Sequence, residues 1–168
     1  MELSEAPAME PVQRGSLKTE VGMIPEDWSV VPLGTLGKFT KGSGVRKDEV
    51  ITEGKACIRY GELYTLHHDL IRTTKTRISS EVATQSKRLR LGDILFAGSG
   101  ETKAEIGKSA VVLIEEEVYA GGDIVILSLE KGDPTYFGYM LNAPIVANQK
   151  ASYGQGDAVV HISAASLS

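Results

Sequence analysis

The sequence predicts an α+β domain with mixed or antiparallel strands and a few helices. Short runs rich in Val and Ile, bounded by glycine, recur along the chain and are typical of strands. One segment near the C-terminus changes to helical periodicity. The 168 residues suffice for one domain with a substantial core. Because strands and helices do not alternate regularly, a doubly wound fold is disfavoured.

The predicted strands are short, and glycine or a basic loop separates one from the next. WSVVPL is the first and ends at Gly34, and DILFAG is an apolar run between two glycines. We expect strands at residues 28–33, 56–63, 93–98, 109–114, 123–129 and 158–162.

Two segments have the end signals of helices. Residues 79–89 begin with serines that can cap the first turn and end with basic residues. Residues 133–151 begin with Asp133 as a cap, followed by a proline at the first helical position. Pro144 is expected to kink or interrupt this second helix, and residues 163–168 are typical of the first turn of another.

The N-terminal residues 1–18 are polar, contain prolines and show no periodicity. We expect a disordered leader or linker there, followed by one domain over residues 19–168. Cys57 is the sole cysteine, so an internal disulfide is excluded and a reducing, cytoplasmic setting is expected. We expect its thiol to be a small buried hydrophobic group.

The charge distribution is uneven along the chain. The whole sequence has 18 Lys and Arg residues against 22 Asp and Glu residues, whereas residues 38–108 have 14 against 9. A basic centre between acidic ends favours a surface that meets an anion. The alternative is a chance fluctuation on a solvated surface.

The known catalytic motifs are incomplete. GKS at 107–109 does not complete a phosphate-binding-loop motif, because Thr102 stands where that motif needs glycine. AGSGE at 97–101 lacks both glycines of a nucleophile elbow, and the histidines have neither triad nor metal-site spacing. An enzyme is therefore the weaker hypothesis, with no metal expected. Its remaining form is a small hydrolase with Ser99 or Cys57 as nucleophile.

Four glycine-containing loops with basic or aromatic neighbours favour double-stranded DNA as the partner, and they lie, in order, at residues 41–47, 59–64, 99–103 and 153–156. Their glycines allow close backbone approach, and cations and hydroxyls can bind phosphates. The predicted phosphate-binding residues are Lys41, Arg46, Lys47 and Lys103. Candidates for reading base edges in the major groove are Ser43, Arg59, Tyr60, Tyr64, Glu101, Thr102 and Gln155. Ser99 and Tyr153 complete the set of predicted DNA-binding residues.

Each loop also has a purely structural interpretation. Tyr60 and Tyr64 can be half-buried packing residues, and Arg59 can pair with a carboxylate such as Glu62. A protein-interaction module without DNA contact of its own therefore remains the alternative function.

Several segments, in order, resemble one known family. TEVGMIPEDWSVVPLGTLG at 19–37 resembles the N-terminal segment of a target-recognition domain in the specificity subunit of type I restriction–modification enzymes. LRLGDILFAGSGE at 89–101 is similar to the family's L-x-x-G-D-I-L segment and following loop. The remaining similar segments are IRYGEL at 58–63, AGGDIVILSL at 120–129, YFGYMLN at 136–142 and GQGDAVVHISAASLS at 154–168.

The resemblance implies a non-catalytic chain that reads one half of a split DNA target. Separate modification subunits would bind S-adenosylmethionine and methylate adenine, and a restriction subunit would cleave DNA. The family's spacer helix and second recognition domain are absent from these 168 residues. No cofactor is expected on this chain.

Overall fold

The computed structural model describes residues 15–156 and 159–168. Most of the predicted leader and part of the last predicted strand therefore lie outside the described residues. The chain divides into two compact units, with the division after Val31.

The first unit contains an antiparallel hairpin of β1 (Ser16–Thr19) and β2 (Gly22–Pro25), with Leu17 opposite Ile24. Gly22 has a φ of 108°, a conformation that glycine adopts without steric cost. Strand β1 begins inside the range predicted to be a leader.

The predicted strand at 28–33 is wrong. Residues 28–32 have no regular structure, and a 3₁₀ turn, η1, follows at Leu33–Thr35. Pro32 cannot donate a ladder hydrogen bond. Trp28 is 47% exposed.

The second unit is built on two five-stranded mixed sheets. The first has the order β3-β13-β9-β11-β6, and its pairs are antiparallel except for β11 with β6. Its strands are β3 (Gly37–Lys41), β6 (Asp69–Ile71), β9 (Ile94–Ala97), β11 (Ser109–Val112) and β13 (Ile124–Leu129).

The second sheet has the order β4-β7-β5-β12-β8, with β5 and β12 parallel. Its strands are β4 (Val50–Ile51), β5 (Lys55–Ile58), β7 (Thr76–Ile78), β8 (Lys87–Arg88) and β12 (Val118–Ala120). A separate pair joins β10 (Ser99–Gly100) to β14 (Val160–His161). Mixed sheets with helices outside them confirm the predicted α+β class.

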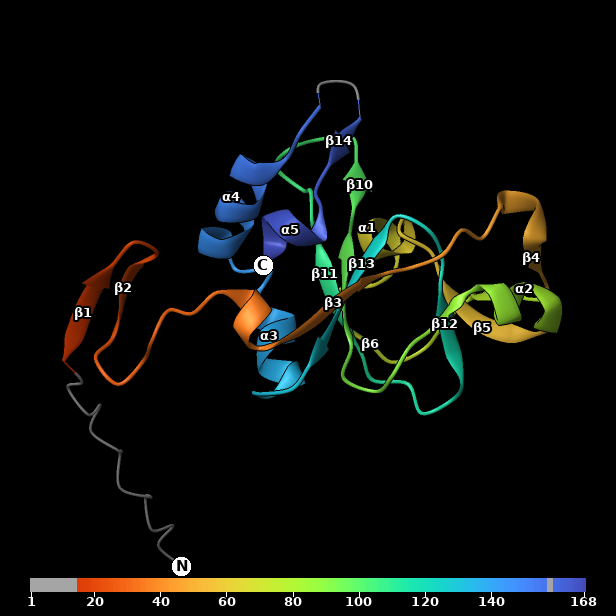
Figure 1. The fold of residues 1–168 in the computed structure, drawn as a ribbon, viewed down its shortest axis with the longest axis horizontal. Coiled ribbons are helices and arrows are strands. Elements are labelled where there is room, and N and C mark those ends of the chain that lie inside the picture. Colours follow the sequence, from red (N-terminus) through yellow and green to blue (C-terminus); the bar gives the residue numbers. More distant parts are fainter. Residues whose placement is uncertain (1–14, 157–158) are drawn as a thin grey trace, which may run out of the picture. The chain divides into compact units, whose positions relative to one another are not determined.

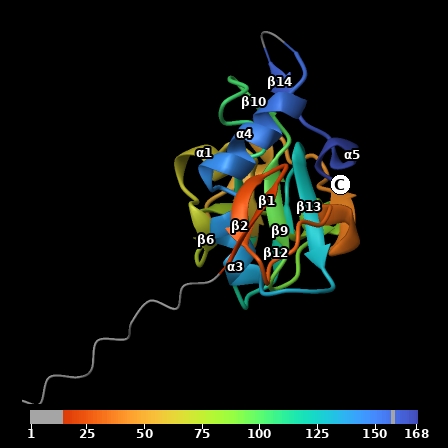
Figure 2. The same cartoon turned by 90° about the vertical axis from the view of Figure 1, so that its left-hand side faces the viewer.

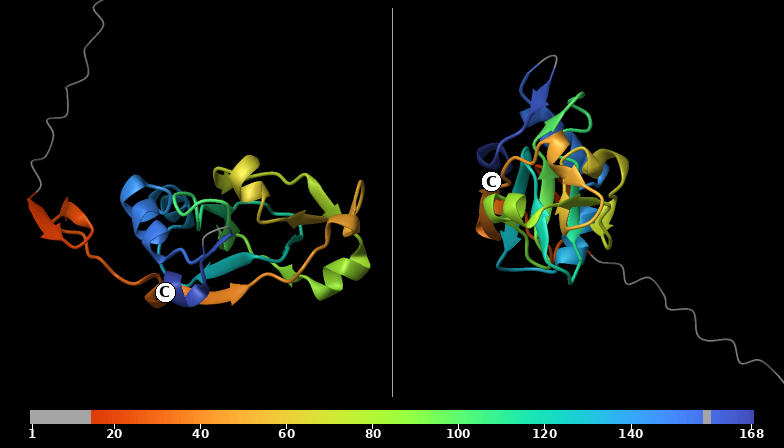
Figure 3. Two further views of the ribbon diagram at one scale, coloured as in Figure 1. Left: turned by 90° about the horizontal axis from the view of Figure 1, so that it is seen from above. Right: turned by 90° about the vertical axis from the view of Figure 1, so that its right-hand side faces the viewer.

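The helices are short, and they are α1 (Glu62–Thr65), α2 (Ser80–Gln85), α3 (Pro134–Met140), α4 (Pro144–Tyr153) and α5 (Ala164–Leu167). Of these, α3, α4 and α5 lie on the face of the first sheet that points away from the second sheet, as Figures 1 and 3 show. Ser79 caps α2 and Asp133 caps α3, as predicted, and Pro144 separates α3 from α4. The basic residues expected to end α2 instead form β8.

Alternation along β9 divides the core into two layers. Leu95 and Ala97 pack in one cluster with Ile58 and Ala120 of the second sheet. Ile94 and Phe96 point to the opposite face and pack with residues of α3 and α5. The central part of the first sheet is thus buried on both sides, which explains why β9, β11 and β13 are largely apolar runs.

Candidate nucleic-acid interface

The first predicted loop, residues 41–47, is held by backbone contacts. Gly42 N–H donates to Ile124 O (2.9 Å), and Ser43 Oγ donates to the carbonyl of Gln85 (2.8 Å). A Cβ on Gly42 would meet a carbonyl oxygen at 2.0 Å, so this position requires glycine. The Ser43 hydroxyl, a predicted base contact, is therefore engaged within the protein.

Arg59 lies beside this loop. A Cβ placed on Gly121 would lie 3.7 Å from both Val45 Cβ and Arg59 Cγ, so the two segments meet over that glycine. The Glu62 carboxylate accepts from Arg59 N–H (2.8 Å) and Thr76 Oγ1 (2.7 Å). Glu62 thus holds the backbone of the turn rather than the guanidinium. Tyr60, at 38% exposure, follows on the same turn.

Tyr64 connects α1 to the third predicted loop. Its hydroxyl donates to Ser99 O (3.0 Å), and its ring packs against the core. Burial raises the pKa of Tyr64 to about 12, with the nearby Glu105 carboxylate as the second cause. Tyr64 therefore lies where the structural interpretation of this residue, as a half-buried packing residue, places it. The residues that follow in this loop, Glu101, Thr102 and Lys103, are exposed.

The fourth predicted loop meets the third through β10 and β14, which lie side by side in Figures 1 and 2. His161 is opposite Ser99 in this pair, and on its other side it exchanges two backbone hydrogen bonds with Gln155 (2.8 and 2.9 Å). Tyr153, the last residue of α4, is 50% exposed.

A pocket of about 250 Å³ lies where these loops meet. Three predicted residues, Lys41, Ser99 and Gln155, line it. The structure adds His161 and Asp123, which were not predicted as contacts. Asp123 has a φ of 57°, which is uncommon for a residue other than glycine, and follows two glycines. That unusual conformation has no sequence signal beyond the glycine pair.

A buried lysine contacts the segment that follows the third loop. Lys150 of α4 is 5% exposed, and its Nζ donates to the Gly107 carbonyl (2.6 Å). The same Nζ lies 5.8 Å from the centre of the Phe96 ring. Burial lowers the pKa of Lys150 to about 8. Nothing in the amphipathic pattern of α4 indicated a buried cation.

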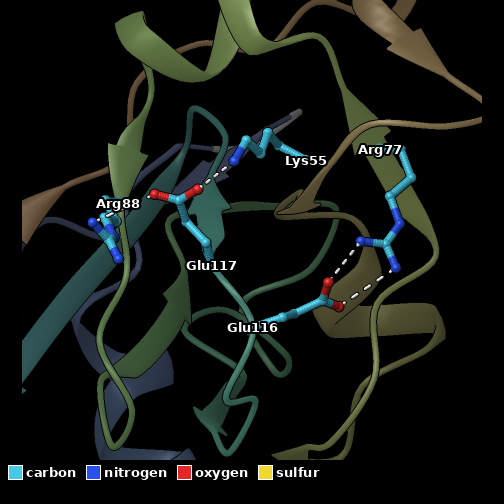
Figure 4. Close-up of polar contacts among 5 residues, drawn as sticks. All are labelled: Lys55, Arg77, Arg88, Glu116 and Glu117. Carbon is cyan, nitrogen blue, oxygen red and sulfur yellow. Dashed lines mark hydrogen bonds and ion pairs between the residues drawn. The ribbon is translucent and has the colours of Figure 1, made fainter.

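The basic excess is only partly available to a partner. In the second sheet, Glu117 pairs with Lys55 (2.6 Å) and Arg88 (3.4 Å), and Glu116 pairs with Arg77 (3.1 Å), as Figure 4 shows. Glutamates outside the basic segment thus neutralise several of its cations.

The four predicted phosphate-binding cations are all exposed, and none has an ion-pair partner within residues 15–156 and 159–168: Lys41, Arg46, Lys47 and Lys103. Lys41 lines the pocket. Arg46 and Lys47 lie at η2 (Lys47–Glu49), which leads into β4 at the edge of the second sheet. The predicted contacts therefore extend from the pocket to this sheet edge.

The hydrolase alternative has little geometric support. Ser99 Oγ lies 2.9 Å from His161 Nδ1, but Ser99 is 5% exposed and so is shielded from a substrate. Within the described part of the chain, no carboxylate bonds the His161 ring to orient it as a base. Cys57 is fully buried, and burial raises its pKa to about 12, which disfavours the nucleophilic thiolate.

Neither a metal site nor a membrane-spanning helix is found among the described residues. No three of their His, Cys, Asp or Glu side chains are placed to hold an ion. None of the described helices combines the length and apolar character needed to cross a bilayer.

No protein-family model and no curated protein matches this chain. Its fold is similar to solved structures, among them the HsdS subunit from Thermoanaerobacter tengcongensis, with 16% identity and a TM-score of 0.57. That likeness covers 86% of this chain and 32% of the other. The Type-I restriction-modification system S subunit from M. genitalium is 15% identical with a TM-score of 0.51, over 82% and 31% of the two chains.

A third similar chain comes from a structure of the complex assembly and conformational transition of the type I R-M system. It is 18% identical with a TM-score of 0.50, over 73% of this chain and 30% of that one. The present chain thus spans about a third of the length of the structures it matches. These likenesses establish that the chain has the α+β fold found in the specificity subunits of type I restriction–modification systems.

Proposed function

We propose that this chain is a non-catalytic recognition module that binds double-stranded DNA and reads one half of a split target. The observation that carries the proposal is the meeting of the third and fourth loops with the end of β3 around one pocket, where Lys41 is exposed. The fold shared with S subunits supports the same function. Arg59 and Tyr60 lie on a turn next to this site, and Glu62 holds the backbone of that turn in place.

We further propose that the chain acts with modification and restriction subunits in the cytoplasm. In this proposal a modification subunit binds S-adenosylmethionine and methylates an adenine, and another subunit cleaves DNA. Methylation of a base within a duplex requires its extrusion from the stack, at a cost of a few kcal/mol. A module that holds the flanking duplex helps to offset that cost.

Salt-dependent DNA binding tests the proposal. Four phosphate contacts predict that log Kobs falls with log salt concentration at a slope of about −3.6, which is about 150-fold between 50 and 200 mM. The affinity of the 168-residue protein for a mixed-sequence duplex is measured by fluorescence anisotropy at each salt concentration. A flat salt response, or no binding at low salt, contradicts DNA recognition and favours the protein-interaction alternative.

Two substitutions separate sequence reading from phosphate binding. We expect Lys47→Ala to weaken binding to all duplexes alike and to reduce the salt slope by about 1. Arg59→Ala is expected to lose about 1–3 kcal/mol of discrimination between a matched and a scrambled duplex. The matched sequence comes from selection of bound duplexes out of a random pool.

Lys131→Ala is the matched control. This lysine is also exposed but follows the opposite end of β13 from the pocket residue Asp123. It is expected to leave both affinity and slope unchanged. Equal losses for the Arg59 and Lys47 variants on both duplexes reject the division of roles.

A further inference from the structure

His161 lines the pocket, although no sequence pattern indicated a role for it. Its backbone joins two of the predicted loops, since it pairs with Ser99 on one side and with Gln155 on the other. The residue itself is exposed and lines the pocket with Lys41. A residue whose backbone is paired on both sides holds its side chain in better order than one on a free loop.

The contact with Ser99 fixes which ring nitrogen carries the proton. The buried Ser99 hydroxyl lies 2.9 Å from Nδ1, and this is its one hydrogen-bond contact with the described residues. If Nδ1 carried the hydrogen, the hydroxyl hydrogen would lack an acceptor in a buried position, which is costly. The hydroxyl therefore donates to Nδ1, and the neutral imidazole carries its hydrogen on Nε2.

We propose that His161 Nε2–H donates a hydrogen bond to a backbone phosphate oxygen of duplex DNA, with Ser99 as the positioning residue. This inference rests on the proposed function. Lys41 supplies the cation in the same pocket, and Gln155 supplies a second neutral donor. The exposed Asp123 carboxylate on the pocket wall repels an anion, so the phosphate lies on the Lys41 side of the pocket. The neutral imidazole adds a directional donor without adding charge.

Salt titrations of variants test the direct contact. His161→Ala is expected to weaken binding about tenfold for matched and scrambled duplexes alike, as expected for loss of a hydrogen bond to a charged group. Its salt slope stays unchanged, because a neutral donor releases no counterion. Lys41→Ala is expected to reduce the slope by about 1. A loss confined to the matched duplex, or a reduced slope for His161→Ala, overturns the phosphate assignment.

Coupling between the two residues tests the positioning role. Ser99→Ala is expected to weaken binding about threefold, Ser99→Thr to retain the wild-type affinity, and Ser99→Ala to have no further effect in a His161→Ala background. Gln at position 161 carries its own amide donor, so His161→Gln should bind independently of Ser99. Equal effects of Ser99→Ala in all backgrounds indicate a general structural defect and overturn the role.

Imidazole ¹⁵N spectra of the free protein give a readout that does not depend on DNA. The wild type is expected to show the Nε2–H form of His161, and Ser99→Ala a mixture of both neutral forms. A predominant Nδ1–H form in the wild type overturns the inference. If His161→Ala binds DNA as tightly as the wild type, this inference alone is overturned. If the wild type itself shows no salt-dependent DNA binding, the proposed function is overturned.

Discussion

Substitution of Lys150 by Met should change how stability depends on pH. The lysine is 5% exposed, donates to the Gly107 carbonyl and has no carboxylate partner among the described residues. Met has a similar length and no charge. The substitution therefore removes a titrating group from the core while largely preserving its packing.

The size and sign of the effect follow from the lowered pKa. Burial lowers the pKa of Lys150 from 10.5 to about 8, so the folded state holds the proton less tightly than the unfolded state. The resulting penalty is absent above pH 10.5, grows as pH falls, and is complete below pH 8. As the pH rises from 7 to 10, this linkage raises the free energy of unfolding of the wild type relative to Lys150→Met by roughly 2–3 kcal/mol.

Urea unfolding of the wild type and Lys150→Met at pH 7, 8, 9 and 10 measures the difference. Titration of Tyr64 and Cys57 acts on both proteins and cancels when the two curves are subtracted. Lys131→Met, at an exposed site, is the control and should give a difference that does not vary with pH. A constant difference between wild type and Lys150→Met across this range would refute the assignment of Lys150 as a buried, charged group.

Two further predictions concern stability and reactivity. The Asn142 side chain accepts from Ser109 N–H and donates to Ser109 O and Asp69 Oδ1. Asn142→Ala should therefore destabilise the fold by about 3 kcal/mol, whereas the control Asn148→Ala, at an exposed site, should cost under about 0.5 kcal/mol. Urea unfolding midpoints of both variants measure these losses. A smaller loss than about 1 kcal/mol would contradict the role of Asn142 as an anchor. Cys57 should resist a thiol reagent at pH 8 until urea unfolds the chain, because burial raises its pKa to about 12. Rapid labelling of the folded protein would contradict its burial.

The strands of the first sheet and the larger helices could be predicted because local and tertiary preferences agree there. DILFAG is an apolar run between glycines and forms the central strand β9. Asp133 and Pro144 act as a cap and an interruption in whatever tertiary setting they occupy. WSVVPL has the same local preference for extended structure, but residues 28–32 are irregular and Leu33 begins η1.

The DNA contacts stay a prediction, because the loop residues have side chains suited to DNA but no fixed spacing that would identify a site. The structure brings Lys41 and Gln155 to one pocket, whereas Ser43 and Ser99 use their hydroxyls within the protein. His161 and Lys150 were missed since their roles depend on contacts between residues far apart in sequence. Such contacts leave no periodicity that a local pattern could reveal.

The strand order also has a consequence for how the protein is made. Strand β3 pairs only with β13 within the first sheet, and 82 residues separate Lys41 from Ile124. At about 5–20 residues per second, a ribosome needs about 4 to 16 s to synthesise that interval. During this time the nascent chain carries β3 without its hydrogen-bonding neighbour, so the first sheet closes late in translation.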